Sequence, residues 1–79
     1  MRWGIRLTKR AVKELYALER VLVPNVWAVL RALLEDPDAA NLQTDEDDPS
    51  LYWLAVEGDI AVFFEIVDEE KTIVVIRIE

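Results

Sequence analysis

The side chains that could do chemistry in this 79-residue chain are carboxylates and a few cations. The sequence contains no histidine and no cysteine, so it lacks the usual general base near neutral pH, the commonest metal ligand and any thiol nucleophile. Stabilisation of negative charge in a transition state would need preorganised cations. Arg77 is the only cation on the last three predicted strands, and it is therefore the only catalytic candidate among the cations there.

Carboxylates offer two further possibilities. The acidic run at residues 45–48 could bind a divalent cation, but it lacks the central glycine and the terminal glutamate of an EF-hand loop. We interpret it as a solvated loop, or alternatively as an acidic surface that binds a basic partner in place of nucleic acid. Glu65 with Glu57 or Asp59 could form an acid/base pair, although carboxylates that point outward from strands are ordinary. We expect no metal and no cofactor.

The last third of the chain must position these groups. Residues 51–57, 59–67 and 72–78 are rich in β-branched and aromatic residues and predict three strands, with turns at Gly58 and at residues 68–71. Side chains alternate across a strand, so the even-numbered residues form an almost wholly apolar face. The odd-numbered face is mixed, and its apolar residues predict a partner-binding surface: Trp53, Ala55, Ala61, Phe63, Ile73 and Val75. The open alternative is that strand twist and the loop at residues 37–50 cover this face within the molecule.

Two helices are predicted to cover the even-numbered face. A short strand over residues 2–7 precedes Thr8, which has the character of a helix N-cap. The first helix is predicted to end near Arg20, and the second to begin at Pro24 and stop at Asp36, before Pro37. The expected fold class is α+β, with the order β-α-α-β-β-β and a helical hairpin packed on one face of an antiparallel sheet. We predict a single domain over residues 1–79.

The charge is distributed unevenly along the chain. The formal net charge is −7, but residues 1–31 hold seven of the nine Lys and Arg residues and only two of the sixteen acids. The basic residues near the N-terminus could form a phosphate-binding stripe, although a solvated helix is the preferred interpretation: Arg2, Arg6, Lys9, Arg10 and Lys13. No apolar run is long enough to span a bilayer and no leader sequence is visible, so we expect a cytoplasmic protein without membrane partners.

Three segments together carry a resemblance to a known family. They are IRLTKRAVKEL at residues 5–15, LLEDP at residues 33–37, and LYWLAVEGDIAVFFEI at residues 51–66 with the strand that follows. In their order and spacing the chain resembles the RelE/ParE superfamily, the toxins of bacterial and archaeal type II toxin–antitoxin modules. The resemblance implies the family's fold over nearly the whole chain.

The resemblance also shows where this chain departs from the family. In RelE-type members, basic residues on the strands orient mRNA and stabilise charge during its cleavage. The aligned positions are Trp53, Ala55 and Ala61, and none of them is basic. A basic residue that follows the last strand in the family would lie beyond Glu79. The resemblance therefore implies fold and ancestry, and we predict a catalytically degenerate member of the family.

Three functional hypotheses follow. The first is a toxin-like module that binds an antitoxin-like protein, or a second copy of itself, through the odd-numbered face. The second is an active toxin of the family, which would be either a ribosome-dependent mRNA endonuclease or a ParE-like gyrase inhibitor. The third is a structural interaction domain without a toxin role. Loss of partner binding on Trp53→Glu would favour the first hypothesis, and loss of RNA cleavage on Arg77→Ala would favour the second.

Overall fold

The computed structural model describes residues 3–36 and 42–79. Predictions that concern Arg2, Pro37 and the first part of the 37–50 loop lie outside the described residues. In chain order the elements are β1 (Gly4–Leu7), α1 (Lys9–Ala17), the 3-10 turn η1 (Arg20–Leu22), α2 (Val23–Glu35), β2 (Gln43–Thr44), β3 (Tyr52–Val56), β4 (Ile60–Val67), the 3-10 turn η2 (Asp68–Glu70) and β5 (Thr72–Ile78).

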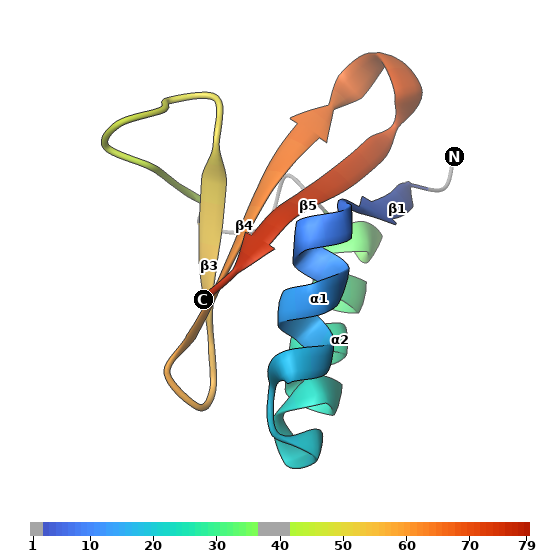
Figure 1. Cartoon of the computed structure of the whole chain (residues 1–79). Helices are drawn as coiled ribbons and strands as arrows, with labels where there is room; N and C mark the ends of the chain where they lie inside the picture. Colours follow the sequence, from blue (N-terminus) through green and yellow to red (C-terminus); the bar gives the residue numbers. More distant parts are fainter. Residues whose placement is uncertain (1–2, 37–41) are drawn as a thin grey trace.

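The two helices lie side by side on one face of a five-stranded sheet (Figure 1). The strand order is β1-β5-β4-β3-β2, and the predicted α+β class with its helical hairpin is confirmed. The sheet is mixed rather than antiparallel throughout, because β1 pairs in parallel with β5 at one edge. β2 is an additional short strand within the predicted loop, and it pairs antiparallel with β3 at the other edge.

Local chemistry places the helix boundaries. The Thr8 hydroxyl accepts a hydrogen bond from the Ala11 N–H at 3.1 Å, so the predicted N-cap is confirmed. α1 ends at Ala17, three residues before the predicted end, because Leu18 adopts an extended conformation (φ −70°, ψ 154°). α2 carries a proline in its first turn, as predicted, and ends one residue before Asp36.

The core lies between the helices and the facing side of the sheet, which we call the inner face. Phe64 is fully buried there and its ring stacks on Tyr52 at a centroid distance of 5.9 Å. Ala11 and Leu15 come from α1, and α2 contributes further buried side chains: Val26, Leu30 and Leu33. Removal of this apolar surface from water, at about 25 cal/mol per Å², is the main stabilising contribution.

A β-bulge on β5 overturns part of the predicted alternation. Phe63 pairs with Arg77 but Phe64 pairs with Val75, so β5 contains one extra residue, Ile76, at this point. A shift of one residue moves side chains to the opposite face. Ile73 and Val75 are therefore fully buried in the core, and their predicted place on the exposed odd-numbered face is wrong. Arg77, beyond the bulge, keeps its predicted side.

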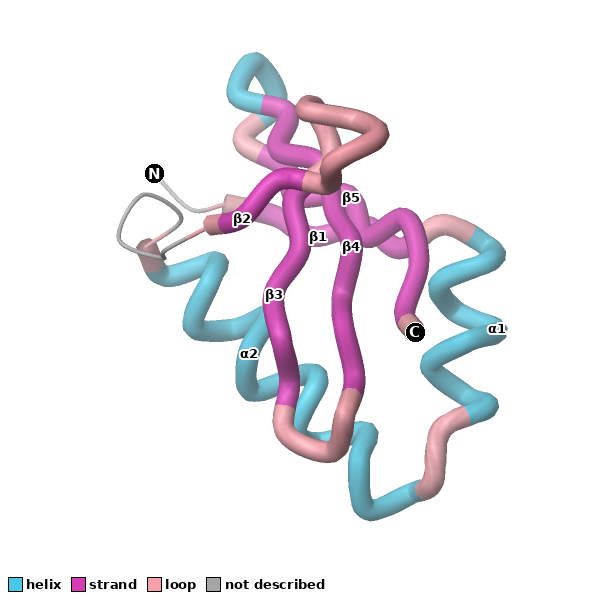
Figure 2. Tube along the Cα trace, turned by 90° about the vertical axis from the view of Figure 1, so that its left-hand side faces the viewer, coloured by secondary structure: helices cyan, strands magenta, loops and turns pink. Residues whose placement is uncertain are grey.

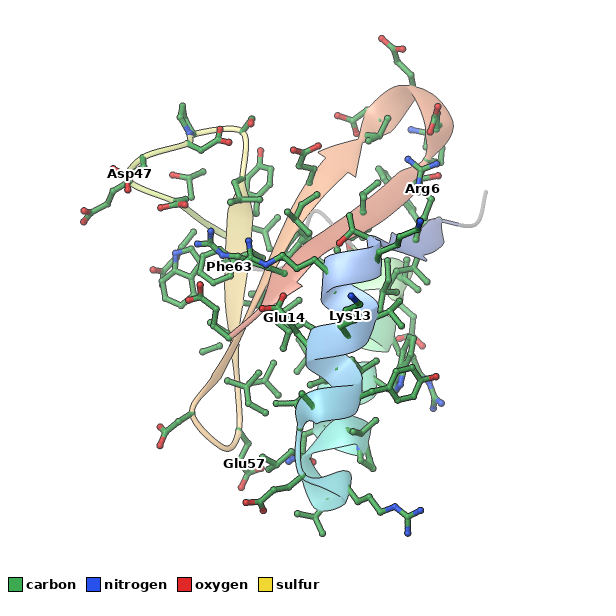
Figure 3. All side chains as sticks on the ribbon, viewed as in Figure 1. Arg6, Lys13, Glu14, Asp47, Glu57 and Phe63 are labelled. Carbon is green, nitrogen blue, oxygen red and sulfur yellow. The ribbon has the colours of Figure 1, made fainter. Side chains whose placement is uncertain are left out.

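On the edge of β5 that faces β1, the end of the strand is held by α1 rather than by another strand. β1 pairs with β5 only as far as Val75. Beyond that point the Thr8 hydroxyl donates to the Ile76 carbonyl at 2.8 Å, and the Ile78 N–H donates to Glu14 Oε1 at 3.1 Å. Figure 3 shows Glu14 directed from α1 towards this end of the strand. Side chains of the helix thus satisfy backbone groups that the bulge and the short β1 leave without a strand partner.

The β3–β4 hairpin ends against η1 (Figure 2). Gly58 has a φ of +104°, which favours glycine. A Cβ at this position would lie 2.7 Å from Leu22 Cδ2, so the backbone approaches the helical layer more closely than a side chain would allow. The tip of the hairpin thus packs against Leu22 of η1.

Candidate functional site

The face of the sheet that points away from the helices, the outer face, holds the candidate binding residues. Trp53 on β3 is directly opposite Phe63 on β4, and Ala55 is directly opposite Ala61. Ala55 is exposed and the other three are half-buried. We call these four residues the outer strip. The sequence predicted their common face correctly, and β3 and β4 bring them together; a binding role for them stays a prediction.

Arg77 is enclosed by groups from three parts of the chain. Its guanidinium carbon lies 4.0 Å from the centre of the Phe63 ring. Its Nη2 lies 3.8 Å from Asp45 Oδ2. Its Nε lies 3.2 Å from Glu79 Oε1, in a geometry that makes an ion pair but not a hydrogen bond. Two carboxylates and an aromatic ring therefore surround the one cation on β3, β4 and β5, and its side chain is only 27% exposed.

The segment between β2 and β3 reaches over part of the outer face. The Asp45 N–H donates to the Leu51 carbonyl at 2.8 Å, and the Leu51 N–H donates to the Asp48 carbonyl at 3.0 Å. Leu51 is only 7% exposed, although it does not belong to the core cluster. The sequence left open whether this loop covers the outer face. In the structure the loop covers that face at Leu51 and Arg77, whereas Ala55 stays exposed.

The acidic run itself shows no metal site. Within the described residues, no three carboxylates gather closely enough to hold a metal ion. Asp48 accepts hydrogen bonds from the Ser50 hydroxyl at 2.6 Å and from the Ser50 N–H at 3.0 Å. These bonds lower the pKa of the Asp48 carboxyl, the hydroxyl having the larger effect. Glu46 and Asp47 are exposed (Asp47 is labelled in Figure 3).

The suggested acid/base pair is not assembled. Glu57 and Asp59 lie in the turn before β4, whereas Glu65 lies near the other end of that strand. Six residues of extended chain from Asp59 to Glu65 span roughly 20 Å. Paired carboxylates in glycosidases are about 5–10 Å apart. This arrangement therefore excludes the pair as a catalytic unit.

The opposite, helical side of the molecule carries exposed cations. Lys9 and Lys13 on α1 are exposed, and Arg10 pairs with Glu14 at 3.4 Å. Arg6 is also exposed, but it lies on the outer face of β1, because it pairs with Val74 and Val74 pairs with Glu65. Tyr16 on α1 is 81% exposed and Val21 in η1 is 72% exposed. Two concavities of about 420 and 310 Å³ share Val23 and Pro24 on this side, and their further lining comprises Tyr16, Leu18, Arg20, Trp27, Ala28 and Arg31.

Several side-chain contacts could not be anticipated from the sequence. Asp45 and Glu79 as partners of Arg77 are examples, because both contacts depend on tertiary packing and no local motif marks them. Another is Lys71, whose ammonium lies 5.3 Å from the centre of the Trp3 ring. No helix among the described residues combines the length and apolar character needed to cross a membrane.

Solved structures of other proteins share the fold of this chain. A scan of protein-family models and a search of curated proteins find no match to this sequence. Among solved structures, the toxin–antitoxin complex RelBE2 from Mycobacterium tuberculosis matches with a TM-score of 0.84 at 18% identity, over 100% of this chain and 98% of that one. The intact RelBE toxin–antitoxin complex from E. coli matches with a TM-score of 0.83 at 19% identity, over 96% and 93% of the two chains.

An archaeal protein shares the same fold. The RelE–RelB complex from Pyrococcus horikoshii matches with a TM-score of 0.74 at 18% identity, over 100% of this chain and 94% of that one. Such low identities establish a shared fold and leave function to be argued from the residues. The predicted resemblance to the RelE/ParE superfamily is confirmed in its fold: this chain has the RelE-like α+β fold, two helices on a five-stranded mixed sheet.

Proposed function

We propose that this chain is the toxin-like component of a type II toxin–antitoxin module, that it has lost RNA cleavage, and that it acts by protein–protein binding through the outer strip. The structures it resembles include RelE proteins in complex with RelB-type antitoxins. An antitoxin-like protein is therefore the proposed partner, and a second copy of the chain is the alternative occupant of the same surface.

The environment of Arg77 is the main support for the proposed loss of RNA cleavage. A cation stabilises a phosphodiester transition state best when it is aimed at the developing charge and no neighbouring anion competes for it. Arg77 instead lies within 3.8 Å of Asp45 and 3.2 Å of Glu79. The neighbouring positions on the outer face are Trp53, Ala55 and Ala61, which supply no cation. The local charge thus opposes the approach of an RNA backbone.

The observation that supports binding is the exposure of apolar side chains beside this cluster. Trp53 and Phe63 are half-buried on the outer face, and Ala55 is exposed. Large aromatic side chains dominate the energetics of protein interfaces. The short side chains of Ala55 and Ala61 let a partner approach the sheet beside them.

Growth of a bacterial host after induction of this chain alone tests the proposal. We expect normal growth and soluble protein, because the proposed module has no cleavage activity. Arrest of growth that Arg77→Ala relieves would contradict the proposal and favour an active ribonuclease. Arrest that Arg77→Ala leaves unchanged would favour a ParE-like action on gyrase.

Binding needs its own measurement. The protein encoded beside the gene for this chain is co-expressed and the complex is isolated by size-exclusion chromatography, and the chain alone is run to detect a dimer. Trp53→Glu should abolish the complex or the dimer while the circular dichroism spectrum is retained. Val21→Glu, which alters an exposed apolar residue on the helical side, is the matched control and should leave binding intact. Equal effects of the two substitutions would contradict a role for the outer strip.

A further inference from the structure

The charges around the outer strip specify the chemistry of its partner. Glu65 lies two residues beyond Phe63 on the same face of β4, and Glu79 exchanges both backbone hydrogen bonds with Ala61 at 2.9 Å. The loop after β2 begins with Asp45 at the edge of the strip, because Gln43 pairs with Trp53. The acids that border the strip are therefore Asp45, Glu65 and Glu79, and the loop that continues from Asp45 adds three exposed acids: Glu46, Asp47 and Asp48.

Few cations balance these acids. Arg77 is already shared by Asp45 and Glu79. Arg6 on β1 lies on the same face as Glu65 but two strands from it, with Val74 between them. In the part of the chain that the structure describes, Glu46, Asp47 and Glu65 have no ion-pair partner. The surface beside Trp53 therefore has an excess of negative charge around an apolar centre.

We propose that the outer strip binds a cationic amphipathic segment of a partner protein, whose apolar residues cover Trp53 and the two alanines and whose Lys or Arg side chains meet Glu46, Asp47 and Glu65. This inference rests on the proposed binding function and names the chemistry of its partner. Complementary charge at the rim steers association and rejects partners of the wrong sign. An anionic partner, including nucleic acid, is disfavoured at this face for the same reason.

A pair of synthetic peptides tests the inference. One is a 14-residue amphipathic peptide of leucine and lysine, and the other replaces each lysine by glutamate. Each is titrated into the ¹⁵N-labelled chain, and backbone amide shifts are followed by NMR. We expect the lysine peptide to bind about tenfold or more tightly than the glutamate peptide, with the largest shifts at Trp53, Ala55 and Ala61.

Matched charge variants separate a specific surface from general attraction to an acidic protein. The variant E46Q/D47N/E65Q should weaken binding of the lysine peptide by about tenfold, because the three proposed surface ion pairs are lost together. The control variant E19Q/E35Q/E69Q removes the same charge elsewhere, and it should change binding less than about twofold. Equal weakening by the two variants, equal binding of the two peptides, or shifts confined to the helical side would each overturn the inference.

The inference and the proposed function can fail separately. A chain that arrests growth through Arg77, yet binds the lysine peptide on the outer strip, would overturn the proposed function alone. A harmless chain that binds its partner through Trp53, but shows no preference for the lysine peptide, would overturn the charge inference alone.

Discussion

The two faces of the sheet are built from alternate residues of the same strands, yet they serve different purposes. The inner face packs Phe64, Val62 and Ile60 against the helices, and each is at most 4% exposed. The outer face carries half-buried aromatic residues beside Arg77 and several carboxylates. Stability is therefore concentrated on the inner face, and the chemistry of the outer face can change without loss of the fold.

The bulge on β5 marks where this division departs from simple alternation. Before Ile76 the odd-numbered residues of β5 face inward, and beyond it Arg77 faces outward beside Phe63. Without the extra residue, either Ile73 would leave the core or Arg77 would enter it. The bulge thus lets one strand supply both buried apolar residues and the cation of the outer cluster.

The largest expected effect comes from a charge placed on the inner face. Ile73→Glu would bury a carboxylate among apolar side chains, at a cost of about 4 kcal/mol or more. A domain of this size has a total stability of about 4–12 kcal/mol, so a third or more of it would be lost. Urea denaturation followed by circular dichroism measures the change. Ala55→Glu on the exposed outer strip is the control and should cost less than about 1 kcal/mol; similar losses for both would contradict the assignment of faces.

Truncation of Phe63 and of Phe64 compares the two faces of the sheet at adjacent positions. Phe64→Ala removes a fully buried ring and should cost about 3–5 kcal/mol. Phe63→Ala removes a half-buried ring and its contact with Arg77, and should cost about 1 kcal/mol. Comparison of the two urea midpoints tests the contrast. A larger loss for Phe63→Ala would mean that the outer cluster, rather than the core, dominates stability.

Thr8 links helix α1 to the bulge. Thr8→Ala removes the N-cap acceptor and the hydroxyl that donates to the Ile76 carbonyl. We expect a loss of about 1–2 kcal/mol in the free energy of unfolding. Thr8→Ser keeps both bonds and should recover most of it. Hydrogen exchange of the Ile78 amide should quicken in Thr8→Ala if the end of β5 depends on α1, and an unchanged rate would contradict that dependence.

The smallest effect concerns the loop beside the outer strip. Ser50→Ala removes the hydroxyl that lowers the pKa of Asp48, so the pKa should rise towards its ordinary value, as NMR titration of the carboxyl would show. A depressed carboxyl pKa stabilises the folded loop above the ordinary aspartate value of about 3.9 and loses this contribution as the pH falls through the lowered pKa. An unchanged pKa would mean that Ser50 has no influence.

Much of the fold could be predicted from local patterns. The N-cap at Thr8, the proline at the start of α2 and the end of α2 before Asp36 are each specified by neighbouring residues. The apolar character of β3, β4 and β5 predicted three strands whose bounds agree with the structure to within one or two residues. Parallel pairing of β1 with β5 was not predicted, because these strands are separated by almost the whole chain.

The sequence predicted which residues lie together at the centre of the candidate site, but not the contacts that surround them. Trp53, Ala55, Ala61 and Phe63 share a face because the β3–β4 register follows directly from a short hairpin. Ile73 and Val75 were misplaced, because a bulge depends on pairing between two strands and not on the composition of either one. The contacts of Asp45 and Glu79 with Arg77 join segments that approach each other only in the folded chain.

The sequence by itself determined the elements, their apolar faces, the lack of histidine and cysteine chemistry, and the excess of acids in the C-terminal part. These properties belong to single residues or to short repeats, so they can be read without knowing which segments meet. Only the tertiary structure decided which face each residue of β5 occupies and which anions surround Arg77. Both depend on the register between distant segments, where a shift of one residue reverses the direction of every side chain beyond it.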